Sequence, residues 1–356
     1  MVAYTSIVSK LEAASDIPED VRNDTTHHVK DSHGKTFKFR NPTPPPAALP
    51  NPHSPSPASS SGSAKLTGDM PDPDITNVKI PTVKPSFSPT RTGSSDALRA
   101  TWLGHACYLT EFPSGLRVLF DPVFDDRCGP MGWLGPKRYT SPACALADLP
   151  EVDAVVISHS HYDHLSHGSV MEIAKRNPNA WFFVGMGLER WFRSSGIERH
   201  SSGRTGRDHD HTLWCSWAVK SGGKSVWFGG DTGYRRVPKV AVDIDDYGPE
   251  YDSLPRCPQF KQIGELRGPF DLGLIPIGAY RPRWMWSWMH ANPYDSVEIF
   301  KDTRCKRAMG IHWGTWMLTS EEVEEPPRLL REALKTSGIP EEGVFDVCAV
   351  GETREF

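Results

Sequence analysis

The stretch from residue 155 to residue 164, VVISHSHYDH, constrains this chain more than any other. Its first three residues are β-branched and apolar, which indicates a buried strand, and they run directly into three histidines and an aspartate. Imidazole nitrogens and carboxylate oxygens are ligands that suit zinc and similar divalent ions. The i, i+2 spacing lets His159 and His161 point at one ion, which leaves Asp163 and His164 for another. The stretch therefore predicts a strand that ends in a loop of metal ligands.

The plain alternative is a polar loop that is rich in histidine by chance, because a His-x-His pair alone is weak evidence. Four ligand-type residues within six positions, directly after a strand, favour the metal site. Two further predicted strands end in the same way: residues 225–228 run towards Asp231, and residues 307–311 run into His312. In each case a buried strand would fix the backbone, and the loop beyond it would present a ligand.

Composition divides the chain into two parts. Half of the positions from 42 to 57 are proline, and residues 58–63 contain only serine, glycine and alanine. Such a segment sustains neither a helix nor a sheet ladder, so we expect residues 1–95 to be a disordered tail. Residues 81–89 would lead onto the folded body as an extended arm. Residues 96–356 would form one domain, for which the 38% apolar content is sufficient.

Short apolar segments within this domain alternate between the periods of strands and of helices, which predicts an α/β fold. Asn292 and Pro293 mark a helix start, as an N-cap followed by proline at the first helical position. The predicted strands are residues 100–103, 108–110, 116–120, 153–158, 181–184, 225–228, 307–311 and 344–350, and the predicted helices are residues 169–176, 188–194, 293–300 and 327–335.

Charge and cysteine usage exclude several classes. The net charge of −4 gives no reason to expect nucleic acid as a partner. The seven cysteines form no C-x-x-C pair and are odd in number, so we expect free thiols in a reducing compartment. No apolar run approaches the roughly 18 residues of a membrane span, and the start lacks a signal pattern. We therefore expect an intracellular protein, soluble or peripherally attached to a membrane, in the cytoplasm or the mitochondrion; its oligomeric state stays open.

Several motifs resemble those of known proteins. The histidine loop, GDTG at 230–233 and HWG at 312–314 resemble the metallo-β-lactamase superfamily. The runs WLGHA (102–106), GPKRY (135–139), SHSHYDHL (158–165), GDTGY (230–234), IPIGAYRPRW (275–284) and IHWGT (311–315) more closely resemble the N-acyl-phosphatidylethanolamine-hydrolysing phospholipase D family within it. The resemblance spans residues 98 to 352. It implies a four-layer αββα sandwich with a metal pair at one edge of the sheets.

The same resemblance implies a ligand set for two zinc ions per chain. Carried over onto this sequence, the ligands are His159 and His161 for the first ion, Asp163 and His164 for the second, Asp231 as a bridge between both, His312 to complete the second site and His200 to complete the first. His200 is placed by the run SSGRT that follows it.

The chain departs from the family pattern next to His200. The family has a further segment of a few tens of residues after the run at 196–199, whereas here Arg199 joins His200 directly. Either an alternative transcript or gene model has dropped an internal stretch, or the lineage has lost it. We expect one or two strands to be missing near residues 199–200, which would expose a sheet edge. His200 is then either a ligand or an exposed loop histidine.

The resemblance also implies a reaction. Two zinc ions about 3.5–4 Å apart can share a water and lower its pKa from about 15.7 towards 7, which provides hydroxide as the nucleophile at neutral pH. By resemblance, this hydroxide attacks the phosphorus of an N-acyl-phosphatidylethanolamine, and the products are N-acylethanolamine and phosphatidic acid. A phospholipid substrate implies peripheral contact with a membrane.

Four residues are candidates for catalysis. Asp163 and Asp231 would act by holding the ions. His290 and Tyr162 would contact the phosphate or protonate the leaving oxygen; for His290 the alternative is a packed histidine before a helix. His105 would support ligands rather than bind an ion. The aromatic and methionine residues of 284–289 suit an acyl-chain groove, a bilayer interface or ordinary core.

Two rival functions remain open. The first is another hydrolase of the superfamily, which cleaves a lactam, a thioester or a lactone. Asp231 argues against a true β-lactamase, which by resemblance has cysteine there, and His161 argues against the iron-dependent oxidoreductases, which have glutamate. The second is an inactive or weakly active shortened variant that acts as a binding protein.

Overall fold

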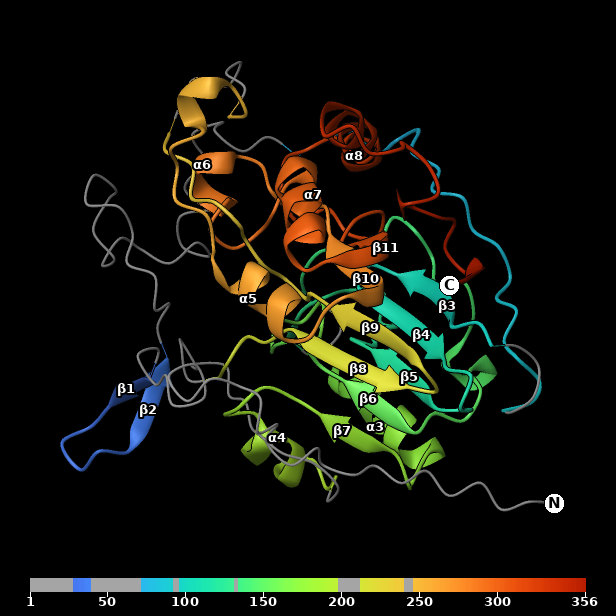
Figure 1. Cartoon of the computed structure of the whole chain (residues 1–356). Coiled ribbons are helices and arrows are strands. Elements are labelled where there is room, and N and C mark those ends of the chain that lie inside the picture. The colour runs from blue at the N-terminus through green and yellow to red at the C-terminus, as the bar shows by residue number, and fades with distance from the viewer. Residues whose placement is uncertain (1–27, 40–71, 92–95, 131–133, 198–211, 240–245) are drawn as a thin grey trace.

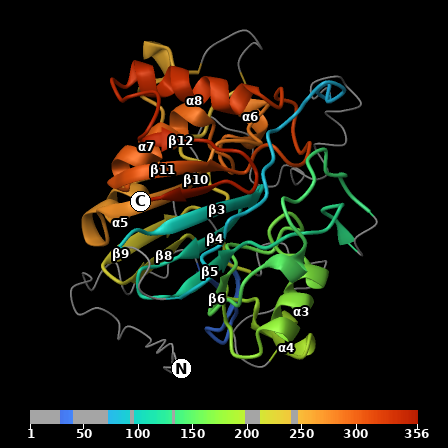
Figure 2. The same cartoon turned by 90° about the vertical axis from the view of Figure 1, so that its right-hand side faces the viewer.

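Two β-sheets pack face to face, and helices cover the outer side of each sheet (Figure 1, Figure 2). The computed structural model describes residues 28–39, 72–91, 96–130, 134–197, 212–239 and 246–356. Figure 2 shows the layers in turn: α7 and α8, the sheet with β10 and β11, the sheet with β3 to β6, and then α3 and α4. The architecture is the four-layer αββα sandwich that the family resemblance implies.

The first sheet has six strands in the order β13-β3-β4-β5-β6-β7. β3, β4 and β5 form an antiparallel meander, and β6 and β7 run parallel to β5. Alternate residues enter different cores: Trp102 faces the other sheet, whereas Leu103 faces the helices α3 and α4. The bounds are β3 Arg99–Gly104, β4 Cys107–Glu111, β5 Arg117–Phe120, β6 Ala154–Val156, β7 Trp181–Phe183 and β13 Thr353–Glu355.

The second sheet has five strands in the order β12-β11-β10-β9-β8. β9 to β12 are parallel, and β8 forms an antiparallel pair with β9. The sequence analysis assigned neither β8, whose residues are all partly or fully exposed, nor β10, in which Gly273 and Pro276 interrupt the apolar run. The bounds are β8 Trp217–Ser221, β9 Lys224–Phe228, β10 Phe270–Pro276, β11 Cys305–Ile311 and β12 Phe345–Asp346.

The helices are amphipathic covers for the two sheets. α7 begins at Asn292, whose side chain accepts the backbone N–H of Asp295, as the sequence predicts for an N-cap. Phe120 and Phe228 meet between the sheets with ring centroids 4.9 Å apart, and Trp227 contacts Phe260 of α5 on the outer side. The helices are α3 His167–Arg176, α4 Glu189–Ser194, α5 Gln259–Leu266, α6 Arg283–Trp286, α7 Pro293–Asp302 and α8 Glu325–Thr336, with the short 3-10 turns η2 Leu146–Asp148 and η3 Pro249–Tyr251.

Most of the predicted N-terminal tail lies outside the described residues. Within it, β1 (His28–Lys30) and β2 (Thr36–Phe39) form an antiparallel hairpin, which the sequence analysis did not expect. Its turn holds together because Asp31 accepts two backbone N–H groups of the turn itself. Within the predicted arm, Thr82 forms a parallel bridge with Val350 of the folded body.

The last predicted strand is wrong in extent. Of residues 344–350, only the two residues of β12 lie in a sheet, and Val350 pairs with the arm instead. The chain then turns at Gly351, which has φ of 91°, and continues as β13 in the other sheet. A side chain at Gly351 would collide with the carbonyl oxygen of Val83 at 1.9 Å, so glycine permits this crossing between sheets.

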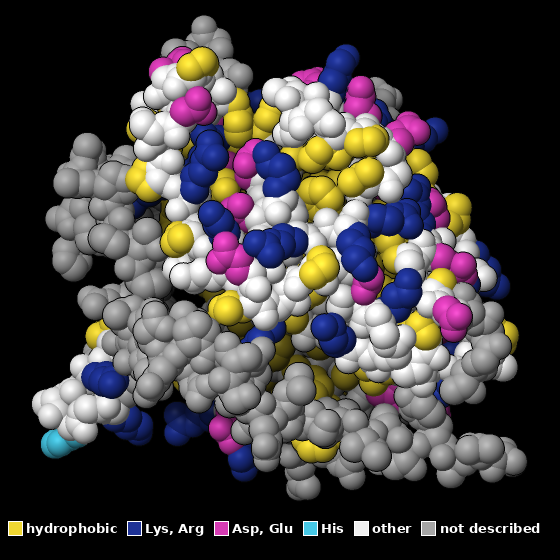
Figure 3. Space-filling view, viewed as in Figure 1, with side chains coloured by type: hydrophobic (Ala, Val, Ile, Leu, Met, Phe, Trp, Pro, Cys, Tyr) yellow, Lys and Arg dark blue, Asp and Glu magenta, His cyan; other side chains and the backbone are white. Residues whose placement is uncertain are grey.

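The surface on the side of α5, α7 and α8 carries charges of both signs. Figure 3 shows lysines and arginines interspersed with aspartates and glutamates over this face. The seven cysteines are all free thiols. In the part of the chain that the structure describes, no helix is long and apolar enough to span a bilayer.

Candidate metal centre

The predicted ligands meet where strands of both sheets end. His159, His161, Asp163 and His164 follow β6, Asp231 follows β9, and His312 follows β11. Because these strands run parallel to their neighbours, their carboxyl ends lie at one edge of the sandwich. Six of the seven ligands predicted from the sequence are thus brought together. The seventh, His200, lies outside the described residues.

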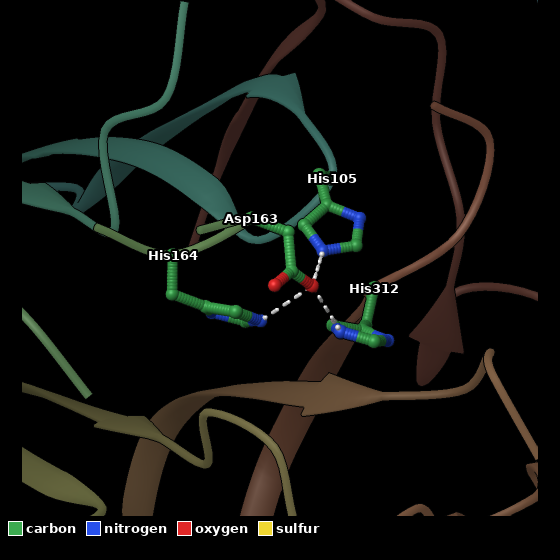
Figure 4. A group of neighbouring side chains, drawn as sticks. All are labelled: His105, Asp163, His164 and His312. Atoms are coloured by element: carbon green, nitrogen blue, oxygen red, sulfur yellow. Dashed lines mark hydrogen bonds and ion pairs between the residues drawn. The ribbon is translucent and has the colours of Figure 1, made fainter. Parts of the chain in front are cut away.

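One group of ligand atoms surrounds Asp163. In Figure 4 its carboxylate lies between His105, His164 and His312, which come from three separate segments. Oδ2 of Asp163 lies 3.0 Å from Nε2 of His105, 3.3 Å from Nε2 of His164 and 3.3 Å from Nε2 of His312. The carboxylate is therefore available to an ion that His164 and His312 also face.

Asp231 lies between this group and the first two histidines. Its Oδ1 is 3.0 Å from Nε2 of His164 and 2.9 Å from Nε2 of His312. Its Oδ2 is 3.6 Å from Nε2 of His159, and His161 belongs to the same group. The loop can approach β6 this closely because Gly230 has φ of 60°, and a Cβ there would lie 2.5 Å from Cβ of Ser158.

The arrangement fits divalent ions better than hydrogen bonding. Among the described residues, Nε2 of His159, His164 and His312 and both carboxylate oxygens of Asp231 are buried without a hydrogen bond of good geometry. Left unsatisfied, each would cost about 1–3 kcal/mol. Two ligands of one tetrahedral zinc ion at about 2.0–2.1 Å are about 3.3 Å apart. The contacts of 2.9–3.6 Å are close to that spacing, so imidazole and carboxylate atoms face one another as ligands of shared ions do.

The pKa shifts of the ligand side chains also favour binding of divalent ions. Burial alone lowers the pKa of His164 and His312, but the nearby carboxylates of Asp231 and Asp163 outweigh it: the pKa of His164 lies well above its ordinary value, and the pKa of His312 is raised to about 9. Burial also opposes ionisation of Asp163 and Asp231, yet the neighbouring histidines hold both pKa values well below normal. Two ionised carboxylates in a buried site attract positive charge, which divalent ions would supply in exchange for protons.

Asp121 holds two of the histidines in place, and the sequence analysis missed it. It follows β5 as the ligands follow their own strands. Its carboxylate accepts the backbone N–H of Ser158 at 2.8 Å and the Ser158 hydroxyl at 2.5 Å, and it lies 2.6 Å from Nδ1 of His164. Ser158 Oγ in turn lies 3.0 Å from Nδ1 of His159. A carboxylate on Nδ1 fixes the tautomer in which Nε2 is free to bind an ion.

We predict that Asp121→Asn weakens metal binding about 10- to 100-fold. The asparagine fits the backbone, since Asp121 has φ of 37°, a region in which asparagine is enriched. Its amide, however, cannot accept hydrogen bonds at both oxygen positions, so N–H would face Nδ1 of His164 and favour the tautomer with the proton on Nε2. Competition with a chelator measures the affinity. Asp153→Asn, at the opposite end of β6, is the control; equal affinities in both variants would contradict the prediction.

His105 lies beside Asp163 and belongs to the group of side chains that could hold an ion there, so the supporting role expected from the sequence stays a prediction. Its backbone N–H donates to Oγ1 of Thr315 at 2.8 Å, and its carbonyl accepts the indole N–H of Trp102 at 2.9 Å. These bonds hold the left-handed turn at His105, which has φ of 52°. Burial lowers the pKa of His105 to about 3, so a neutral ring lies against Asp163.

His290 lies on the other side of Asp231, with Nδ1 3.8 Å from Oδ2. Its segment is tied down on both sides. The backbone N–H of Ala291 donates to the carbonyl of Thr232 at 2.7 Å, and Nη1 of Arg283 lies 3.4 Å from the carbonyl of His290. Arg283 is itself held at 2.5 Å by Asp295. The buried ion pair therefore fixes where His290 lies relative to Asp231.

The other candidates from the sequence differ in their surroundings. Tyr162 is half-buried and packs against Val123, Cys128 and Trp316, so its role at a phosphate stays a prediction. In the aromatic run, Trp284 and Trp286 pack against the buried Met285, whereas Trp288 is 43% exposed. One part of the run is therefore packed in the core, and Trp288 lies at the surface.

Comparisons with known proteins agree with the fold. A family model described as "Beta-lactamase superfamily domain" matches residues 116–200 and 197–313. The two matched segments overlap at residues 197–200, which include the junction of Arg199 and His200.

Three relatives are informative. The N-acyl-phosphatidylethanolamine-hydrolyzing phospholipase D 1 of Caenorhabditis elegans is 36% identical over 295 residues, 74% of this chain and 77% of that protein. The mitochondrial N-acyl-phosphatidylethanolamine-hydrolyzing phospholipase D of Saccharomyces cerevisiae is 30% identical over 69% of this chain and 54% of that protein. A metal-dependent hydrolase of Koribacter versatilis is 30% identical over 64% of this chain and 89% of that protein. This chain therefore belongs to the N-acyl-phosphatidylethanolamine-hydrolysing phospholipase D family of the metallo-β-lactamase superfamily and is a metal-dependent hydrolase.

Proposed function

We propose that this protein is a phosphodiesterase of the phospholipase D type, which hydrolyses N-acyl-phosphatidylethanolamine-like lipids with two zinc ions. The observation that carries the proposal is the position of Asp231, whose two oxygens face different sets of histidines. A carboxylate placed in this way suits a bridge between two ions. The 36% identity to a phospholipase D named for this substrate supports the choice of lipid.

Two divalent ions bound here would supply an activated water and polarise a phosphoryl oxygen. The residues of the chain hold the ions and orient their ligands. His159, His161 and Asp231 would hold the first ion, and Asp163, His164, Asp231 and His312 the second. Asp121 and His105 keep the ligand rings and the Asp163 carboxylate in position from behind.

The substrate has to present its phosphate between these ligands and His290. A neutral His290, whose pKa is lowered to about 4 by burial, offers a hydrogen bond to a phosphate oxygen rather than a proton from an imidazolium. In the reaction, water adds to phosphorus, the P–O bond to the N-acylethanolamine breaks, and the leaving oxygen takes a proton. The products are phosphatidic acid and N-acylethanolamine.

One small cavity lies beside the metal centre. A cavity of about 30 Å³ next to His312 is lined by Tyr139, Gly278, Trp316 and Met317 among others. This volume holds about two water molecules and no acyl chain. We propose that the chains remain in a membrane, with which the protein makes peripheral contact.

The test is hydrolysis of N-acyl-phosphatidylethanolamine in mixed micelles by the zinc-loaded protein, in water enriched in ¹⁸O. We expect the label in phosphatidic acid and about two zinc ions per chain. Label in neither product, with turnover of a thioester, lactone or lactam, would assign the protein to another branch of the superfamily. One ion or none, without turnover of any substrate, would favour the shortened variant as a binding protein.

A further inference from the structure

Trp214 lies against two of the proposed ligands of the first ion. Its ring stacks on that of His159, with centroids 4.6 Å apart and an interplanar angle of 19°. It meets His161 edge-on at 4.8 Å and 84°. The side chain is nevertheless 42% exposed, so burial of its own surface does not explain its position. The proposed reaction assigns it no role.

The backbone around Trp214 is bonded to the histidine loop. The N–H of Cys215 donates to the carbonyl of Ser158 at 3.2 Å, and the indole N–H of Trp217 donates to the carbonyl of Ile157 at 3.0 Å. On the other side of Trp214, the N–H of Leu213 donates to the carbonyl of Met186 at 2.7 Å. The loop that carries the ligands therefore determines where the indole lies.

The stacked indole restrains a rotation that the other contacts of His159 leave open. The terminal torsion of histidine is broad, so the ring plane has to be set by neighbours. Ser158 Oγ lies 3.0 Å from Nδ1 of His159, and the ring of His164 lies on His159 at 4.3 Å with a tilt of 43°. Trp214 supplies the near-parallel contact, at 19°. It contacts His161 as well, so one side chain orients both rings.

The ligands of the second ion have separate supports. Asp121 holds His164, and His105 holds Asp163. No ring contact links Trp214 to His312, Asp163 or His105 among the described residues. Loss of the indole should therefore affect one ion more than the other.

We propose that Trp214 is a positioning residue for the first ion: it holds His159 and His161 in the planes from which both rings face the same divalent cation. The inference rests on the proposed two-ion site. On this view, the affinity of the first site for a divalent cation depends on the indole of Trp214, which is not itself a ligand.

The experiment compares the full chain with three variants: Trp214→Ala, Trp214→Phe and Trp181→Ala. Each is dialysed with Zn²⁺ and a competing chelator, and bound zinc is counted by mass spectrometry. We expect Trp214→Ala to bind the first ion about 10-fold more weakly and to retain the second, because outer partners of ligands contribute about 10- to 100-fold in metal affinity. Trp214→Phe, which keeps a stacking ring, should recover most of the affinity. Trp181, also 42% exposed but on β7, is the matched control.

Unchanged affinity for both ions in Trp214→Ala would overturn the proposal. Equal loss of both ions in Trp214→Ala and Trp214→Phe would also overturn it, since the indole would then act through the fold. Melting of the metal-free proteins checks this point, and we expect the variants and the wild type to coincide. A wild-type chain that binds a single ion would instead refute the two-ion function, an outcome that the wild-type count alone reveals.

Discussion

The Asp231→Asn variant should lose at least one of the two bound ions and most of its hydrolysis. Oδ1 of Asp231 lies 2.9 Å from His312 and 3.0 Å from His164, and Oδ2 faces His159. Asparagine keeps the shape but has one oxygen and no charge, so an N–H group would face the nitrogens of one set of histidines. Outer partners of ligands contribute up to about 100-fold in affinity or activity, and a shared direct ligand should exceed that. We expect at most one zinc ion per chain and activity reduced more than about 100-fold.

The measurement combines zinc content with phosphatidic acid release. Asp271→Asn is the matched control. Asp271 lies on β10 in the same sheet, and its carboxylate accepts hydrogen bonds from Ser225 and Lys306 rather than facing the ligands. It should keep both ions and near-normal turnover. Activity of Asp231→Asn close to that of the unaltered chain would rule out the two-ion mechanism.

The pattern of strands ending in ligands was visible in the sequence because it is local. A run of apolar residues followed directly by histidine or aspartate requires no knowledge of tertiary structure, and it placed His159, Asp231 and His312 correctly at strand ends. Asp121 carries the same signal, since the apolar strand β5 runs straight into it. It was missed because one aspartate before a proline also marks an ordinary turn.

Other features depend on contacts between distant segments. Nothing near Trp214 in the sequence indicates that its ring lies on His159, because this follows from the hydrogen bonds that join the two segments. β10 was missed for a different reason: Gly273 tolerates no Cβ, which would lie 2.8 Å from Sγ of Cys305. The glycine that close packing requires is the same residue that weakens the strand signal.

The sequence likewise contains no sign of how His290 lies relative to Asp231. Replacing His290 should produce the second large effect that we expect. His290 is 7% exposed, its Nδ1 is buried without a hydrogen bond among the described residues, and Oδ2 of Asp231 is 3.8 Å away. A neutral imidazole so placed can donate to a phosphate oxygen, as an alanine cannot. We expect His290→Ala to lower kcat about 100-fold, at the lower end of what the loss of one positioned hydrogen-bond donor costs.

Zinc content separates the possible roles of His290. We expect His290→Ala to retain both ions, whereas loss of one ion would make His290 a ligand. His290→Gln keeps a hydrogen-bond donor and should recover part of the lost kcat, and Trp288→Ala, two residues away and 43% exposed, is the control for local disturbance. If His290→Ala hydrolyses the lipid at the normal rate with normal zinc content, His290 is only the packed histidine before α7. The buried pair of Arg283 and Asp295 would then serve the fold alone, since the position that it fixes would have no bearing on the reaction.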